Sequence, residues 1–94
     1  MTRLRLSSSI ISDTAKAFNV PMDRMLSESR VRPLACARFA AMKIIREERY
    51  LSAQTIARLL KRKDHTTVLN GIRQADKLLA TDPAFRDAYM RAAG

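Results

Sequence analysis

The sequence has few of the residues that build disulfides, sheets and tight turns. Its 94 residues include one cysteine, one histidine, two glycines, three prolines and no tryptophan. Cys36 therefore has no partner for an internal disulfide, and one Cys with one His cannot complete a four-ligand zinc site; this thiol fits the role of a small buried or half-buried residue. The scarcity of glycine and the abundance of alanine, leucine, arginine and isoleucine favour helices over strands. We expect an all-α fold without metal or cofactor.

Patterns that would indicate catalysis, nucleotide binding or membrane insertion are also missing. The sequence contains neither a GxxxxGK[ST] nor a GxGxxG motif. His65 has no Ser or Cys neighbour with the logic of a catalytic triad, and Glu47 and Glu48 point in different directions because they are adjacent on a helix. No apolar stretch approaches the roughly 20 residues that span a bilayer, and no signal-like apolar run follows the basic start. We expect a cytoplasmic protein that is not an enzyme.

The length suits one small domain, which we expect to cover residues 1–94. Apolar spacing and cap residues predict six helices. The first is capped within residues 7–9 and stops near Asn19, the second is short and covers 21–26, and the third is long and covers about 33–49. The fourth is short and capped by Ser52, the fifth starts at Asp64, and the last starts with residues 81–83. Residues 27–32 are predicted to form a loop. The two helices within about 52–80 flank a brief turn, which is typical of a helix-turn-helix.

Positive charge is concentrated in the middle of the chain. The whole sequence has 18 Lys and Arg against nine Asp and Glu, a net charge of +9. Ten of the basic residues lie within 30–63, where Glu47 and Glu48 are the only acidic ones, and both ends are nearly neutral. A merely solvated surface would more often interleave the two signs. We therefore expect a polyanionic partner, and nucleic acid is the first candidate.

The helix predicted to start at Asp64 opens on side chains that can read DNA bases. Asp64 can accept from cytosine N4, His65 can donate to a purine N7, and the methyl groups of Thr66 and Thr67 can pack on thymine. Thr66 lies about 160° from the core-facing Val68 and His65 about 60° from it, so Thr66 should point most directly outward. The alternative is that Asp64 only caps the helix and the threonines only fill its first turn.

The run Asp64-His65-Thr66-Thr67-Val68-Leu69, preceded by a basic residue, resembles the signature of the C-terminal helix-turn-helix DNA-binding domain of the bacterial replication initiator DnaA. Residues 18–20, 25–27, 30–49 and 78–85 extend the resemblance over most of the chain. It implies that Asp64, His65 and Thr66 contact bases in the major groove while Arg30, on a basic loop, enters the adjacent minor groove. The residues that it implies for phosphate contact, or for support of neighbouring contacts, are Arg32, Arg38, Arg46 and Thr67.

The chain departs from the family pattern at three places. Lys61 and Arg62 stand where the family usually has a glycine pair, which makes the turn less permissive and more basic. Ala53 and Gln54 replace a frequent Leu-Pro, and Glu28 lies in a loop that tends to be basic. We expect phosphate contacts from Lys61, Arg62 and Lys63 and a preferred DNA sequence that differs from an initiator box.

The sequence lacks the ATPase module of the initiator, so we expect DNA recognition without the nucleotide-driven opening of an origin. Similar isolated domains occur among prophage-type and gene-transfer-agent regulators of bacteria. The resemblance therefore implies a nucleoid-associated regulator of transcription that binds double-stranded DNA, with RNA polymerase or other regulators as candidate partners. Two alternatives stay open: a replication modulator that competes with the host initiator for origin boxes, and a basic adaptor that binds an acidic protein.

Overall fold

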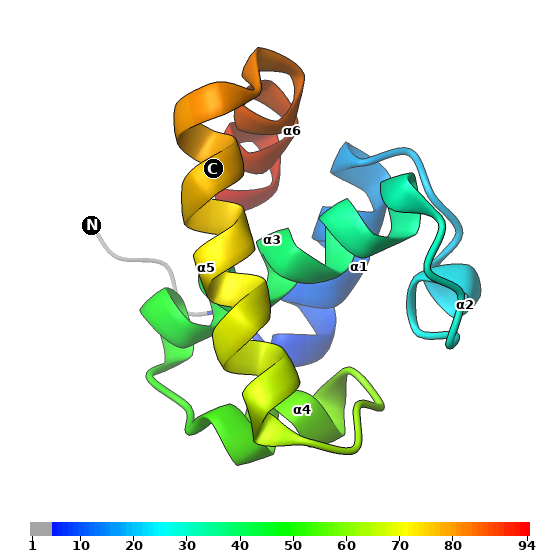
Figure 1. Ribbon diagram of the computed structural model, residues 1–94, viewed down its shortest axis with the longest axis vertical. Helices are drawn as coiled ribbons and strands as arrows, with labels where there is room; N and C mark the ends of the chain where they lie inside the picture. Colours follow the sequence, from blue (N-terminus) through cyan, green and yellow to red (C-terminus); the bar gives the residue numbers. More distant parts are fainter. Residues whose placement is uncertain (1–4) are drawn as a thin grey trace.

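Helices joined by short loops make up the structure, a computed structural model that describes residues 5–94. In chain order they are α1 (Ser7–Ala17), α2 (Met22–Met25), α3 (Arg32–Arg49), α4 (Ala53–Leu59), α5 (His65–Thr81) and α6 (Pro83–Ala93) (Figure 1). No strand occurs among the described residues. The predicted all-α fold and the order of its helices are confirmed, while residues 1–4 of the predicted domain lie outside the described part. None of the helices in residues 5–94 has the length and apolar character needed to cross a membrane.

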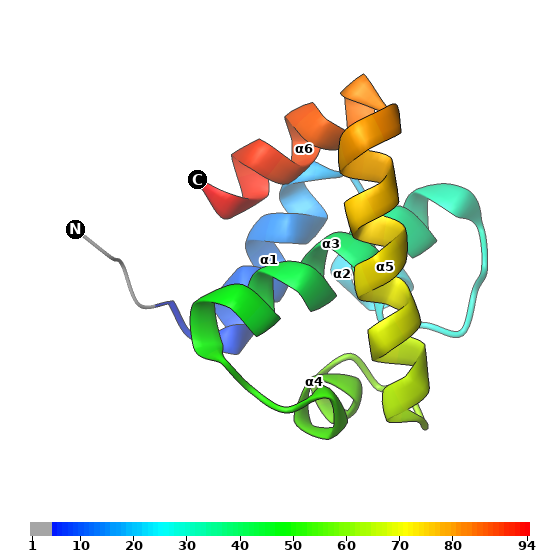
Figure 2. The ribbon, with the colours of Figure 1, turned by 60° about the vertical axis from the view of Figure 1, so that its left-hand side comes forward.

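Helix α3 runs through the centre, with α1 packed on one side and α5 crossing it on the other (Figures 1 and 2). Its inner face alternates small and large apolar residues, among them Ala37, Ala41, Ile44 and Ile45, and all four are buried. The alanines allow neighbouring helices to approach closely, and each buried isoleucine contributes about 1.5–3 kcal/mol of hydrophobic stabilisation. Helix α3 thus forms the support on which the helix-turn-helix of α4 and α5 rests.

Gly71 lets α5 pack directly on α3. A Cβ atom built at this position would lie 2.2 Å from Sδ of Met42 and 3.3 Å from Cδ1 of Phe39. Met42 is itself 1% exposed, so it has little room to move away. The close approach therefore fixes the distance between α5 and α3 one turn after the first residues of α5.

Three of the predicted N-caps are confirmed and one is wrong. The side chains of Ser52, Asp64 and Asp82 each accept a hydrogen bond from the first turn of α4, α5 and α6. The serines at 7–9 lie inside α1 instead of capping it, because Leu6 is the N-cap residue and makes no side-chain cap bond. Asn19 follows the end of α1 and has a φ of 60°. This left-handed conformation commonly ends a helix, so Asn19 is the stop that the sequence predicted.

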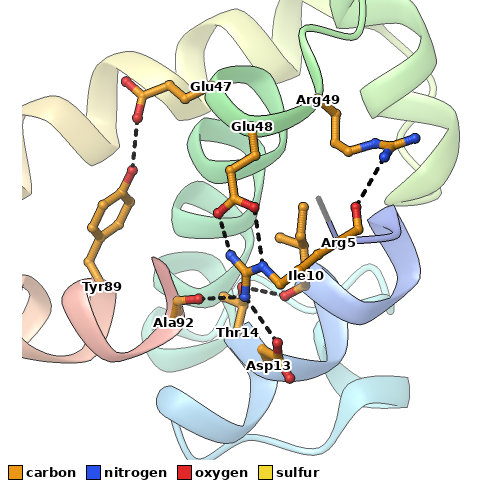
Figure 3. Close-up of polar contacts among 9 residues, drawn as sticks. All are labelled: Arg5, Ile10, Asp13, Thr14, Glu47, Glu48, Arg49, Tyr89 and Ala92. Carbon is orange, nitrogen blue, oxygen red and sulfur yellow. Dashed lines mark hydrogen bonds and ion pairs between the residues drawn. The ribbon is translucent and has the colours of Figure 1, made fainter. Parts of the chain in front are cut away.

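The start of α1 is held by Arg5, a residue that no motif in the sequence marks (Figure 3). The Arg5 side chain is 9% exposed. Its guanidinium pairs with Glu48 at the end of α3, lies 3.0 Å from Asp13 of α1 and donates to the carbonyl of Ala92 in α6 at 2.9 Å. Hydrogen bonds to Glu48 and Asp13 raise the pKa of Arg5 above its ordinary value against the opposing effect of burial. Arg5 therefore joins three helices where the described chain begins.

Candidate nucleic-acid interface

The first turn of α5 presents the predicted base-reading residues to solvent. Asp64, His65, Thr66 and Thr67 are all exposed, whereas Val68 is fully buried. Oδ1 of Asp64 accepts from the backbone N–H of Thr66 at 2.9 Å and lies 3.4 Å from Nδ1 of His65. The hydrogen bond from Thr66 lowers the pKa of Asp64. Asp64 is therefore the N-cap of α5, and its side chain is exposed to solvent.

In the turn between α4 and α5, a lysine adopts a backbone conformation that is usually found at glycine. Lys61 has a φ of 57°, in the left-handed region that glycine favours. The Lys61 N–H donates to the carbonyl of Arg58 at 3.1 Å and the Arg62 N–H to that of Ala57 at 2.7 Å, a Schellman arrangement. A side chain in this conformation costs about 1–2 kcal/mol. Lys61 thus takes the left-handed conformation at an energetic cost, at a position where the family pattern usually has glycine.

The loop at 26–31, between α2 and α3, carries Arg30 at an exposed position. Its own side chains shape it locally, since Oγ of Ser27 accepts from the N–H of Ser29 at 3.2 Å and Oγ of Ser29 accepts from the N–H of Val31 at 3.3 Å. In Figures 1 and 2 this loop lies on the same side of the molecule as the turn that precedes α5. The structure therefore brings Arg30 to the side of the molecule that presents the first turn of α5.

Arg38 points into the protein. It is 6% exposed, and its guanidinium donates to the carbonyls of Met25 at 2.9 Å, Ser29 at 2.5 Å and Ser27 at 3.4 Å. Burial and the neighbouring charge of Arg62 lower the pKa of Arg38. Of the two roles that the family resemblance implies for Arg38, this geometry favours support of the loop over phosphate contact, because carbonyl groups occupy the face that a phosphate would need.

Arg62 is also drawn inward, against the expectation of a phosphate contact. Its Nη2 donates to the carbonyls of Leu26 at 3.1 Å and Ser27 at 2.6 Å, and its Nε donates to that of Leu60 at 3.0 Å. Its neighbours Lys61 and Lys63 are exposed and remain suited to phosphate contact. The basic turn therefore contains two outward lysines and one arginine engaged with the loop.

Arg32 and Arg46 occupy the two ends of α3. The Arg32 side chain is 72% exposed and lies 3.7 Å from Asp82, a surface pair that phosphate can displace. Arg46 is exposed and donates to the carbonyl of Leu51 at 2.9 Å. Lys43, by contrast, pairs with Asp76 at 2.7 Å and Glu47 at 2.8 Å. Burial opposes the charge of Lys43, but these hydrogen bonds outweigh it and raise its pKa.

Two surface hollows flank the start of α5 and add residues that the sequence analysis left out. One, of about 800 Å³, lies between the loop and α5, and its lining includes Arg30, Lys61, Thr67 and Asn70. The other, of about 430 Å³, lies beside α4 and is lined by Gln54, Ala57, Arg58, Arg62, Lys63, Asp64 and His65. Gln54 and Arg58 stand four residues apart, opposite the buried Ile56. That helical spacing is the signal by which the sequence could have identified them.

The comparisons with known proteins agree with this arrangement. Residues 7–75 match the family described as bacterial DnaA protein helix-turn-helix. The chain belongs to this family. Chromosomal replication initiator proteins DnaA from Mycoplasma genitalium and Neisseria meningitidis serogroup C are 32% and 35% identical to it over 78 and 80 residues, and one from Cereibacter sphaeroides is 32% identical over 73 residues. These matches cover 83%, 85% and 78% of this chain but only 18%, 15% and 16% of the relatives. Membership in the DnaA helix-turn-helix family supports DNA binding through α4 and α5.

Proposed function

We propose that the chain binds a specific double-stranded DNA sequence and thereby regulates transcription of prophage-type or gene-transfer-agent genes. In this arrangement the first turn of α5 enters the major groove and Arg30 enters the adjacent minor groove. The observation that carries the proposal is the exposure of Asp64, His65 and Thr66 at the start of α5, which is flanked by hollows whose linings include Arg30, Lys61 and Lys63. Base-reading groups flanked by phosphate-binding cations are what sequence-specific binding requires.

The proposed base contacts follow from the donors and acceptors of the first turn. The carboxylate of Asp64 suits the amino group of cytosine, His65 suits a purine N7, and Thr66 suits the methyl group of thymine. Arg30 suits a narrow A·T-rich minor groove, where negative potential is concentrated. These contacts define a short site in which base recognition comes from α5 and the flanking A·T preference comes from the loop.

We favour regulation of transcription because the exposed first turn of α5 carries groups that can recognise bases. Occupation of a promoter by the first turn of α5 would alter access of RNA polymerase. A second candidate, a modulator of replication that occupies origin boxes, is favoured by the relatives that are named chromosomal replication initiator proteins. Both candidates use the same interface and differ in where the sites lie.

A genome-wide binding map, combined with selection from a random duplex library, separates these functions. Sites enriched at promoters, together with changed expression of the adjacent genes, would support the regulator, and enrichment at origin boxes would support the modulator. The Arg30→Ala variant should lose about five- to one-hundred-fold of its preference for A·T pairs beside the core site. Arg91→Ala removes the same charge from an exposed position on α6 and serves as the matched control. Failure to enrich any sequence would leave the adaptor that binds an acidic protein.

A further inference from the structure

We propose that Arg62 is a positioning residue that ties the loop carrying Arg30 to the turn preceding the recognition helix α5. The two DNA-reading elements are then held in one geometry by a single side chain. This inference rests on the proposed function, because it concerns how Arg30 and the first turn of α5 reach their grooves together. It replaces the phosphate contact that we expected for Arg62 from the sequence.

The contacts of Arg62 span the two elements. Its Nε donates to the carbonyl of Leu60, the C-cap residue of α4, at 3.0 Å. Its Nη2 donates to the carbonyls of Leu26 and Ser27, at 3.1 and 2.6 Å, which lie 36 and 35 residues away along the chain. The guanidinium therefore lies between the turn and the loop, and Arg30 follows its nearest loop partner by only three residues.

Arg38 holds the same loop from α3. The carbonyl of Ser27 accepts from Arg62 and, at 3.4 Å, from Nη1 of Arg38, while Nη2 of Arg38 donates to the carbonyl of Ser29. The loop carbonyls bring partial negative charge to two guanidinium groups that would otherwise only repel each other. The loop thus depends on both arginines, one from the supporting helix and one from the helix-turn-helix.

The chemistry of arginine suits this role and that of lysine does not. A guanidinium offers donors in a rigid planar fork, so Nε and Nη2 can reach carbonyls on different segments at the same time. A lysine ammonium keeps the charge but is a compact group on a flexible stem. Arg62→Lys consequently preserves attraction to phosphate while it removes the simultaneous contacts to the turn and the loop.

The decisive experiment compares DNA preferences of the wild type, Arg62→Lys, Arg30→Ala and the double variant, by selection from a random duplex library and anisotropy on the enriched site. If Arg62 is the tether between the loop and the turn, Arg62→Lys should lose preference for the flanking A·T pairs about as strongly as Arg30→Ala does, by about five- to one-hundred-fold. The double variant should then lose no more preference than either single variant. Lys63→Ala, which removes an exposed neighbouring charge, is the control and should weaken all DNA sequences alike.

Amide hydrogen exchange tests the tether without DNA. Exchange at the N–H groups of Ser29 and Val31 should accelerate in Arg62→Lys and stay unchanged in Lys63→Ala, while the thermal midpoint stays close to that of the wild type. An Arg62→Lys variant that is unfolded, or that binds every sequence with unchanged preference and unchanged exchange, would overturn the tether and leave the proposed function standing. A wild type that enriches no sequence would overturn the proposed function and this inference with it.

Discussion

The salt dependence of DNA binding follows from which basic side chains point outward. Ten Lys and Arg lie within residues 30–63, and a count from the sequence alone would offer all ten to phosphates. The structure engages Arg38 and Arg62 with carbonyls, pairs Lys43 with carboxylates, and turns half-buried Arg49 toward the carbonyl of Arg5. The six that remain exposed are Arg30, Arg32, Arg46, Arg58, Lys61 and Lys63.

The expected slope can be worked from that set. Each neutralised phosphate contributes about −0.9 to the slope of log K against log salt concentration. Six contacts give about −5, and the value is nearer −4.5 when Arg30 occupies the minor groove instead of a phosphate. Ten contacts would give about −9, so the slope distinguishes the inward orientation of four side chains from a fully outward basic surface.

The measurement is fluorescence anisotropy of a labelled duplex titrated at salt concentrations from about 50 to 200 mM. Lys63→Ala should make the slope shallower by about 0.9, and Lys43→Gln, which changes a residue engaged with Asp76 and Glu47, should leave it unchanged. A slope near −9, or an effect of Lys43→Gln equal to that of Lys63→Ala, would refute the assignment of inward and outward residues. A slope near zero would refute DNA binding itself.

Further predictions concern the turn at Lys61, the N-cap Asp64, the exposed Thr66 and the ion-paired Arg5. Lys61→Gly should keep the turn and change the free energy of unfolding by less than about 1 kcal/mol. The reason is that relief of the left-handed strain is offset by the greater freedom of glycine in the unfolded chain. A large destabilisation in thermal melts would contradict the turn geometry. Asp64→Asn keeps a cap but replaces an acceptor by a donor, so selection should show a lost cytosine preference with an unchanged thermal midpoint. Thr66→Ala should also leave the midpoint unchanged and weaken specific binding by about 1–3 kcal/mol, and an unaltered specificity would refute its role in reading. Arg5→Ala removes the partner of two carboxylates that are 40% and 23% exposed and should cost about 1.5–3 kcal/mol in chemical denaturation, with no change in DNA preference among folded molecules.

Local features of the sequence were sufficient to place the helices. Val68 and Ala75 lie two helical turns apart on one face of α5, and Asp64 and Asp82 each carry a side-chain oxygen directly before a helical run. The start of α1 could not be placed in this way, since three consecutive serines offer equivalent caps. The residue that fixes the chain there is Arg5, and one of its partners, Glu48, lies 43 residues away.

The candidate site was predictable where its geometry is local. The outward direction of Thr66 follows from 100° per residue and agrees with its exposure, whereas the inward direction of Arg38 and Arg62 depends on backbone carbonyls of the loop. Carbonyl groups are present in every residue, so no pattern of side chains marks the few that will accept from an arginine. Counting charges therefore identifies the basic segment at 30–63, but it cannot separate the side chains available to DNA from those that bind the loop carbonyls.

This division explains how a turn without the family's glycine pair can be retained. Lys61 takes the left-handed conformation at a cost of about 1–2 kcal/mol, and exposes an ammonium that is available to a phosphate. Arg62 places its guanidinium where the carbonyls of Leu60, Leu26 and Ser27 all accept hydrogen bonds from it. A glycine there has no side chain with which to reach them. The basic turn therefore has a less favourable backbone conformation than a glycine pair would have, but it connects the loop to α5. A Lys61→Gly variant should retain that connection, and an Arg62→Gly variant should lose it.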